Sequence, residues 1–216
     1  MQLPAPLSRF LAAQFRQPSG LFGRLIMPGV LNRRNAALLG ASIEAVALRP
    51  GERLLDLGFG GGQTFRLAAP QVGAEGGLWG VDFSPDVVAA GQRAHRGLIA
   101  AGRLQLVVGD VAQLPLREGW VDAVVSNNTV YFWPDPVSGL RELARVLRPG
   151  GRLALGFSDA EALRRLGSVT THGFTLYTTE ALLELFEAAG LPRPTLRPVR
   201  RGDGGEGTYV ALCALP

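Results

Sequence analysis

The segment LLDLGFGGGQT, residues 54–64, carries the residue types best suited to chemistry. It places one acid, Asp56, in a short apolar run and a cluster of glycines directly after that run. Glycines let the backbone turn tightly and approach a ligand closely, and the helix expected to follow offers free N–H groups. The spacing is Asp56-x-Gly58-x-Gly60-x-Gly62. An acid that points into a glycine-lined pocket favours a ligand with positive charge over a pyrophosphate.

The dinucleotide-binding fingerprint is absent from this loop. A G-x-G-x-x-G pattern that starts at Gly58 requires glycine or alanine at position 63, where Gln63 stands. Starting from Gly60 or Gly61 gives no match either. The loop therefore argues against an NAD-binding protein.

Two further acids end the next apolar runs of the chain. Asp82 lies in GVDFSPDVV, where its carboxylate could accept hydrogen bonds from both hydroxyls of a ribose. Asp110 lies in VVGDVAQLPL, followed by Val111, where a carboxylate could meet an adenine amino group. Each acid alone is equally consistent with an ordinary turn or helix cap. Three acids at consecutive strand ends, with the glycine loop at the first, favour a shared binding site.

Short apolar runs separated by helical patterns predict the elements that position these acids. The clearest helical pattern runs from Ser84, as N-cap, to Ala101, and a second spans residues 135–147. Strands that alternate with helices predict a parallel α/β sheet with right-handed crossovers. The predicted strands, each expected to be buried on both faces, are residues 53–57, 77–83, 104–110, 121–126 and 152–157.

Both ends of the chain read differently from this alternation. A helix is predicted over 178–189, followed by extended runs at 195–200 and 208–215 that are joined by a turn and must be antiparallel. Residues 1–48 show helical periodicity interrupted by prolines and glycines. We therefore predict a helical extension or cap over 1–48 and one ligand-binding domain over 49–216.

Composition narrows the class of protein. The chain has 216 residues, 47% of them hydrophobic, and a net charge of +4, which excludes a mainly disordered chain. All 22 basic residues are arginine, so a phosphate-binding lysine, a Schiff base and a lysine general base are excluded. One cysteine and two histidines argue against a disulfide or a metal site. The small net charge is a weak argument for nucleic acid, and we expect a solvated arginine surface.

Neither a membrane span nor a secretory signal is evident in the sequence. No stretch of roughly 18 apolar residues occurs. The first residues lack a basic segment followed by an apolar one and a small-residue cleavage site. We therefore expect a cytoplasmic protein.

Taken together, the motifs resemble those of class I S-adenosylmethionine-dependent methyltransferases, in the small-molecule branch that includes the ubiquinone and menaquinone C-methyltransferases. Five motifs between residues 50 and 156 occur in the family's order: LLDLGFGGG, GVDFSPDVV, GDVAQLPL, VDAVVSNNTVYFW and VLRPGG. The resemblance implies a Rossmann-like three-layer sandwich around a seven-stranded, mostly parallel sheet with its last strand antiparallel. It also implies S-adenosylmethionine as the cofactor.

Carried over by position, the resemblance assigns one group of residues to the methionine and ribose portions of the cofactor. Gly58, Gly60 and Gly62 would line these portions, and Asp56 would help to hold the ammonium group. Asn127, just past the fourth strand, stands where family members contact the methionine portion.

A second group would hold the adenosine portion. By the same resemblance Asp82 would bind the ribose hydroxyls, Phe83 would flank the adenine, and Asp110 and Val111 would meet the adenine edge. Gly61 departs from many family members, which carry another residue there, and is expected to add flexibility without removing binding.

The acceptor side is less well defined by the sequence. The aromatic run 131–133 (YFW) could exclude water and stabilise a sulfonium, or it could simply pack the loop onto the next helix. No catalytic base is assigned. His172 is interpreted as a loop residue with a general-base role left open, His95 as solvated, and Cys213 as a small buried hydrophobe.

The sequence thus predicts methyl transfer to a small-molecule acceptor by in-line displacement. The alternatives are an RNA or protein methyltransferase that uses the arginine surface, or a non-catalytic cofactor- or nucleotide-binding protein. The N-terminal helices are predicted to cover the acceptor pocket, with the apolar residues Phe10, Phe15, Phe22 and Met27.

Overall fold

The structure is a computed structural model that describes residues 4–16, 27–165, 167–200 and 206–216. Its helices and 3-10 segments are α1 (Ala5–Arg16), α3 (Met27–Val46), α4 (Gln63–Val72), α5 (Pro85–Ala94), α6 (Arg96–Ala100), η1 (Val130–Phe132), α7 (Pro136–Val146), α8 (Ala160–Arg164), η2 (Gly167–Thr171) and α9 (Thr179–Ala188). Its strands are β1 (Arg53–Leu57), β2 (Gly77–Asp82), β3 (Leu104–Val108), β4 (Val121–Asn127), β5 (Leu147–Ser158), β6 (Thr195–Pro198) and β7 (Thr208–Ala214).

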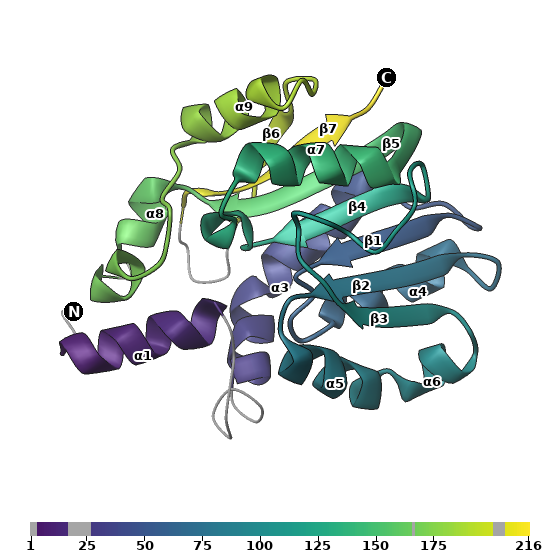
Figure 1. The fold of residues 1–216 in the computed structure, drawn as a ribbon, viewed down its shortest axis with the longest axis horizontal. Helices are drawn as coiled ribbons and strands as arrows, with labels where there is room; N and C mark the ends of the chain where they lie inside the picture. Colours follow the sequence, from purple (N-terminus) through teal and green to yellow (C-terminus); the bar gives the residue numbers. More distant parts are fainter. Residues whose placement is uncertain (1–3, 17–26, 166, 201–205) are drawn as a thin grey trace.

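Within the described residues, seven strands form one sheet in the order β3-β2-β1-β4-β5-β7-β6 (Figure 1). The pairs from β3 through β5 are parallel, whereas β7 runs antiparallel to both β5 and β6. The predicted Rossmann-like sheet, mostly parallel with its last strand antiparallel, is confirmed.

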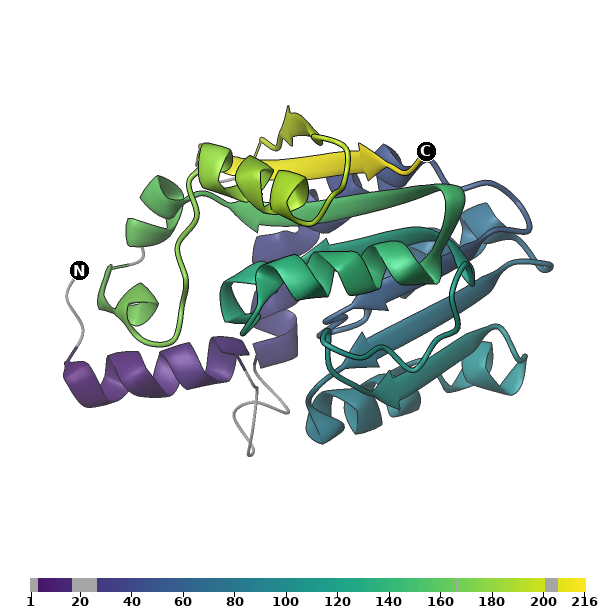
Figure 2. The same ribbon diagram turned by 45° about the horizontal axis from the view of Figure 1, so that its top comes forward.

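Helices cover the two faces of this sheet, so the fold has three layers. Figures 1 and 2 show α7 on one face and α3 and α4 on the other. Alternation along each strand supplies both cores: in β1, Leu54 packs with the α3 and α4 side while Leu55 packs with the α7 side. The carboxyl ends of the parallel strands β1 to β5 lie at one edge of the sandwich.

The predicted helix over 84–101 is divided in two. Ser84 caps it as expected, because its hydroxyl oxygen accepts a hydrogen bond from the Val87 N–H. The helix is interrupted at His95, which separates α5 from α6. The expectation of a solvated His95 is wrong: its side chain is 5% exposed and packs edge-on against Phe65, with ring centres 5.6 Å apart.

Strand β3 differs from the prediction that every strand is buried on both faces. Val107 and Val108 are exposed, at 36% and 51%. The cause is topological, because β3 is an edge strand and the described connection from it to β4 contains no helix that could cover that face.

The described residues of the N-terminal part form two helices, as predicted, although Pro28 and Gly29 lie in the first turn of α3 and do not interrupt it. Leu38, Ile43 and Val46 of α3 belong to the core beneath the sheet. Helix α1 packs instead against η2. The predicted breaks at positions 18, 20 and 23 lie outside the described residues, and the domain boundary near residue 48 stays a prediction.

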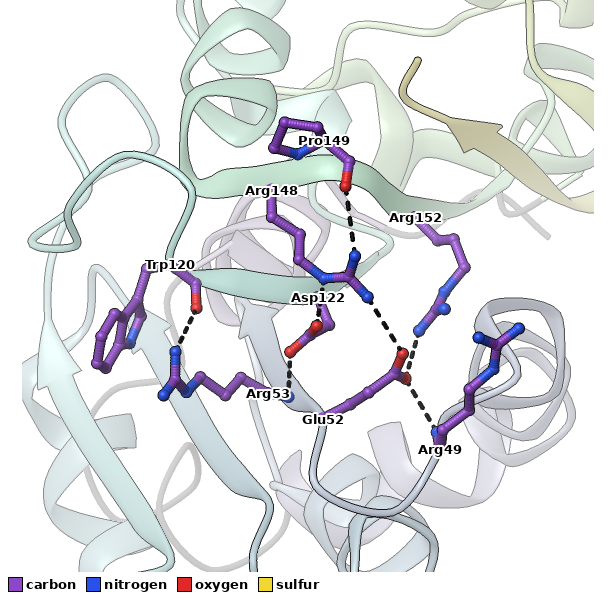
Figure 3. A network of polar contacts seen from close by, with 8 residues as sticks. All are labelled: Arg49, Glu52, Arg53, Trp120, Asp122, Arg148, Pro149 and Arg152. Atoms are coloured by element: carbon purple, nitrogen blue, oxygen red, sulfur yellow. Dashed lines mark hydrogen bonds and ion pairs between the residues drawn. The ribbon is translucent and has the colours of Figure 1, made fainter.

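A network of charged side chains joins the amino-terminal ends of β1, β4 and β5 (Figure 3). Glu52, which is buried, forms ion pairs with Arg152 and, at 3.7 Å, with Arg148. Asp122 accepts hydrogen bonds from the Arg53 N–H at 2.7 Å and from the Arg148 guanidinium. This network lies at the edge of the sheet opposite the carboxyl ends of the strands.

None of the helices in the described part of the chain is long and apolar enough to span a membrane.

Candidate functional site

A cavity of about 260 Å³ opens at the carboxyl ends of β1, β2 and β4. In the sheet, β1 has β2 on one side and β4 on the other, so the strand order reverses at β1. The cavity therefore lies at the topological switch point, where α/β sheets bind ligands. Nearly all of the residues singled out in the sequence line it: Asp56, Gly58, Gly60, Asp82, Phe83, Asp110, Val111 and Asn127. Gly61 lines it as well.

The glycine loop brings backbone against this cavity. Gly58 has a φ of +70°, and a Cβ there would lie 2.4 Å from Cγ2 of Thr129, so a side chain is excluded for two independent reasons. Gly62 is not among the lining residues. It is the N-cap of α4, at a φ of +66°, and faces His95 and Phe65, so its role is to start the helix beside the loop.

The Asp82 carboxylate is tied to backbone on both sides. Its Oδ1 accepts a hydrogen bond from the Ser84 N–H at 3.0 Å, and its Oδ2 accepts one from the Gly60 N–H at 3.3 Å. Burial raises the pKa of this carboxyl above its usual range, and the two backbone donors oppose that rise. The carboxylate is therefore held at the cavity wall with its remaining lone pairs available to a ligand.

Asp56 is the most deeply buried acid of the site, with 2% of its surface exposed. Its Oδ2 atom has no hydrogen-bond partner in the protein. Burial raises the pKa of Asp56 to about 7, the Thr64 hydroxyl acts against this, and the nearby Asp82 carboxylate adds to it. A buried carboxylate oxygen without a donor is costly unless a ligand supplies one.

Asn127 ends β4, the strand beside β1, and is 9% exposed. Its Oδ1 accepts a hydrogen bond from the Ser42 hydroxyl at 2.6 Å, whereas its Nδ2 is buried without a partner. An unpartnered donor and an unpartnered acceptor thus lie on neighbouring strand ends. Together they suit the carboxylate and ammonium groups of an amino acid, so the residues present fit the methionine portion of S-adenosylmethionine.

Another part of the cavity is lined by Phe83, Val111 and Asp110. Phe83 is 40% exposed and Val111 is buried, and both line the cavity. Asp110 is exposed and accepts a hydrogen bond from the Ala112 N–H at 2.8 Å, which fixes its carboxylate at the rim. An exposed ring beside an apolar wall and a carboxylate fits a planar base.

A third part of the cavity is aromatic and apolar. The rings of Phe132 and Phe174 lie 4.6 Å apart, and Tyr131 lies about 6 Å from each of them. All three residues of the run 131–133 line the cavity, and Tyr131 and Trp133 are also buried in the core, so the predicted packing role is present while the role toward a sulfonium stays a prediction.

The Tyr131 hydroxyl is fully engaged. It accepts a hydrogen bond from the Ser158 N–H, and it can donate to the Ser158 carbonyl at 3.1 Å or to Asn128 Oδ1 at 3.2 Å. Burial raises its pKa well above the usual value for tyrosine. Tyr131 therefore holds the loop after β4 and is poorly suited to remove a proton.

Sequence reasoning missed the residues that reach the cavity from elsewhere in the chain. These are Asn35 and Leu39 of α3, together with Ser158, Ala162, Leu163 and Phe174. None of them stands in a motif. Asn128, which also lines the cavity, does stand in a motif, VDAVVSNNTVYFW, and its φ of +57° marks a specialised turn directly after β4.

Residues considered as alternatives lie elsewhere. His172 is not among the residues that line the cavity. Cys213 is buried in β7, as predicted, and burial raises the pKa of its thiol to about 11. Near the end of the chain, Arg193 is paired with Glu180 and Glu187, and Arg201 lies outside the described residues.

The strand order, the reversed last strand and the cavity at the switch point define the class I methyltransferase fold. A solved S-adenosylmethionine-dependent methyltransferase from Aquifex aeolicus has this fold, with a TM-score of 0.71 and 18% identity over 88% of this chain and 97% of that one. Residues 55–155 match the family described as "Methyltransferase domain".

Two curated relatives share this region. An arsenite methyltransferase from Aquipseudomonas alcaligenes is 36% identical over 66% of this chain and 42% of its own length. A demethylmenaquinone methyltransferase from Beutenbergia cavernae is 37% identical over 53% of this chain and 44% of its own length. The matched part of this chain thus spans less than half the length of these relatives.

Proposed function

We propose that the chain binds S-adenosylmethionine in this cavity and transfers its methyl group to a small, neutral acceptor. The observation that carries the proposal is that, among the described residues that line the cavity, two buried atoms lack protein partners, Asp56 Oδ2 and Asn127 Nδ2. A carboxylate and an amide N–H side by side complement the ammonium and carboxylate of the methionine portion, and each would remain uncompensated without such a ligand.

Other residues of the cavity are proposed to bind the ribose and the adenine of the cofactor. Asp82 would accept hydrogen bonds from the ribose hydroxyls, since its carboxylate is already oriented by Gly60 and Ser84. Phe83 would stack on the adenine, with Asp110 and Val111 at its edge. Gly58 and Gly60 would let the loop backbone approach the ligand.

When bound, S-adenosylmethionine supplies a methyl group on a positively charged sulfur. The chain's own task is to align an acceptor with that methyl group and to keep water out, which can lower the barrier by roughly 7–11 kcal/mol. The rings of Tyr131, Phe132 and Phe174 would exclude water from the reacting atoms.

The residues at the acceptor end of the cavity favour a neutral organic acceptor. Among the described residues that line the cavity there is no arginine, although the chain has 22 of them, and the carboxylates lie at the cofactor end. An RNA or another polyanion would need basic groups near the reacting atom. The described residues that line the acceptor end include no free base, so we propose an acceptor that attacks without help from a side chain in proton removal.

Comparison with the relatives sharpens the choice of acceptor. Trivalent arsenic binds thiolates, and the single cysteine, Cys213, is buried in β7 outside the cavity. The aromatic wall instead suits an organic acceptor with an apolar body. Arsenite is therefore not the acceptor that we propose.

We further propose that the N-terminal segment closes the acceptor end. Helix α1 packs on η2, which follows β5 and α8 in the chain, and two of its residues, Ser8 and Ala12, are buried. Of the apolar residues expected to cover the pocket, Phe22 lies outside the described residues, as do the side chains of Phe10, Phe15 and Met27.

A truncation tests the role of α1. Removal of residues 1–16 should lower acceptor turnover while cofactor binding is kept, because Asp56, Asp82 and Asn127 remain. Loss of both would show that α1 is needed for folding of the site.

The proposed cofactor is tested by thermal unfolding with S-adenosylmethionine, S-adenosylhomocysteine or NAD. A ligand at about 100 times its dissociation constant adds about 2.7 kcal/mol to the free energy of unfolding, a rise in Tm of about 5–11 °C for a chain of this size. We expect this rise with both adenosyl ligands and none with NAD. A rise with NAD alone would overturn the proposal.

A second assay addresses transfer itself. Release of S-adenosylhomocysteine is measured with matched sets of neutral aromatic amines, phenols and hydroquinones, with their carboxylated or phosphorylated analogues, and with RNA. Turnover restricted to neutral acceptors supports the proposal, and turnover of RNA alone would favour the nucleic-acid alternative.

A further inference from the structure

Helix α3 contacts the floor of the cavity through two polar side chains on one face. Asn35 and Ser42 are seven residues apart, about two helical turns, so both point to the same side. Each is paired with one of the two consecutive asparagines at the end of β4: Ser42 with Asn127 at 2.6 Å, and Asn35 with Asn128 at 3.2 Å. A helix that precedes the methyltransferase domain therefore orients the loop that follows its fourth strand.

The contact with Ser42 is made by the oxygen end of the Asn127 amide. An asparagine side chain has one accepting oxygen and one donating nitrogen. Because the Ser42 hydroxyl donates to Oδ1, that oxygen is turned toward α3, and the Nδ2 group is left without a protein partner. Ser42 has no exposed surface, so water does not compete for this bond.

The space around the amide accommodates this orientation. A Cβ on Gly156 would lie 2.1 Å from Asn127 Oδ1, so the absence of a side chain at Gly156 makes room for the oxygen on that side. The same Cβ would lie 2.9 Å from Leu38, one turn before Ser42 on α3. The oxygen thus lies between α3 and β5, and only the nitrogen remains for a ligand.

We propose that Ser42 is a positioning residue for cofactor binding, which fixes the Asn127 amide with its N–H directed at the carboxylate of the methionine portion. This inference rests on the proposed function. Without the Ser42 hydroxyl the amide can rotate by half a turn and present its oxygen to that carboxylate, an arrangement in which two acceptors meet.

The test compares two ligands that differ only at the carboxylate end. S-adenosylhomocysteine carries the amino-acid portion, whereas 5′-methylthioadenosine keeps the adenosine and thioether and lacks that portion. By isothermal titration calorimetry, Ser42→Ala should bind S-adenosylhomocysteine about tenfold more weakly and 5′-methylthioadenosine with unchanged affinity. Ser42→Thr, which keeps the hydroxyl, should restore much of the lost affinity.

A double-mutant cycle separates positioning from packing. In an Asn127→Ala background, Ser42→Ala should have no further effect on binding of S-adenosylhomocysteine, because the amide that it orients is gone. Cys213→Ala, a truncation of a buried residue outside the cavity, controls for a general loss of stability.

Two results would overturn the inference. One is an equal loss of affinity for both ligands in Ser42→Ala, and the other is an undiminished effect of Ser42→Ala in the Asn127→Ala background. Failure of the proposed function gives a different pattern, since the unmodified protein would then bind neither ligand.

Discussion

The Oδ2 atom of Asp82, at the end of β2, accepts a hydrogen bond from the backbone N–H of Gly60, in the loop after β1, at 3.3 Å. This bond joins the two strand ends that form the cofactor side of the cavity. One carboxylate therefore has two roles, because it holds the glycine loop in place and faces the position proposed for the ribose.

Substitution of Asp82 should strongly weaken binding of the cofactor. Asp82→Ala removes charge-assisted hydrogen bonds to the ribose and the anchor of Gly60, so affinity for S-adenosylhomocysteine should fall about 10- to 100-fold by calorimetry. Glu184→Gln, an exposed acid on α9, is the matched control and should bind normally. Unchanged affinity in Asp82→Ala would place the ribose elsewhere.

Cofactor binding should depend on pH through Asp56. Its pKa in the free protein is about 7, and the proposed ammonium partner requires the ionised form. Affinity should therefore fall as the pH is lowered through 7, by about tenfold between pH 8 and pH 6. Calorimetry with S-adenosylhomocysteine across this range checks the slope, and Asp56→Asn should bind weakly with a much flatter profile.

Asp56 should also change how the stability of the free protein depends on pH. Because the folded state holds this proton more tightly than the unfolded chain, with its pKa of 3.8, the free energy of unfolding should decrease as the pH rises from about 4 to about 7. Asp82, whose pKa is also raised, acts in the same direction. In Asp56→Asn the Asp56 contribution should vanish, and an unaltered pH profile would contradict the assignment.

Phe83 should contribute to binding and little to stability. Its ring is 40% exposed, so truncation leaves no buried cavity, whereas loss of stacking on a base costs about 1–3 kcal/mol of binding free energy. Phe83→Ala should thus lower the affinity for S-adenosylhomocysteine by about tenfold or more, while the Tm stays nearly unchanged. Phe83→Tyr keeps the ring and serves as the control, and equal affinities of the two variants would argue against stacking.

Glu52 should show the opposite behaviour. Removal of this buried carboxylate leaves Arg152 without its counter-charge, whereas Arg148 keeps Asp122, so Glu52→Ala should lower the free energy of unfolding by about 3 kcal/mol in urea titrations. The site lies at the far edge of the sheet, and affinity for S-adenosylhomocysteine should be retained by the folded protein. Glu161→Ala breaks an exposed ion pair with Arg165 and should change stability little.

Local signals in the sequence were sufficient for the strands and for the cofactor side of the cavity. Strand β1 has the predicted bounds, and Ser84 caps its helix, because apolar runs and cap residues act within a few positions. Asp56, Asp82 and Asp110 converge since the carboxyl ends of neighbouring parallel strands lie at one edge.

The features that sequence reasoning missed depend on contacts between distant segments. Asn35 and Phe174 enter the cavity from elements far from any motif. His95 is buried because its ring meets Phe65, 30 positions earlier in the chain, and Val108 is exposed because no helix covers β3 there. Periodicity reports which face of an element is apolar, but it does not report what will cover that face.

The position of α3 also means that its packing is completed late during synthesis of the chain. This helix precedes β1 in the chain, yet it packs on β5 and on β7, the last strand. While the protein is being synthesised, its apolar side chains, Leu38 among them, lack part of their final surroundings until roughly 170 further residues have been made. Nascent chains that stop before β7 therefore expose α3, and they are the chains that aggregation or a chaperone would capture first.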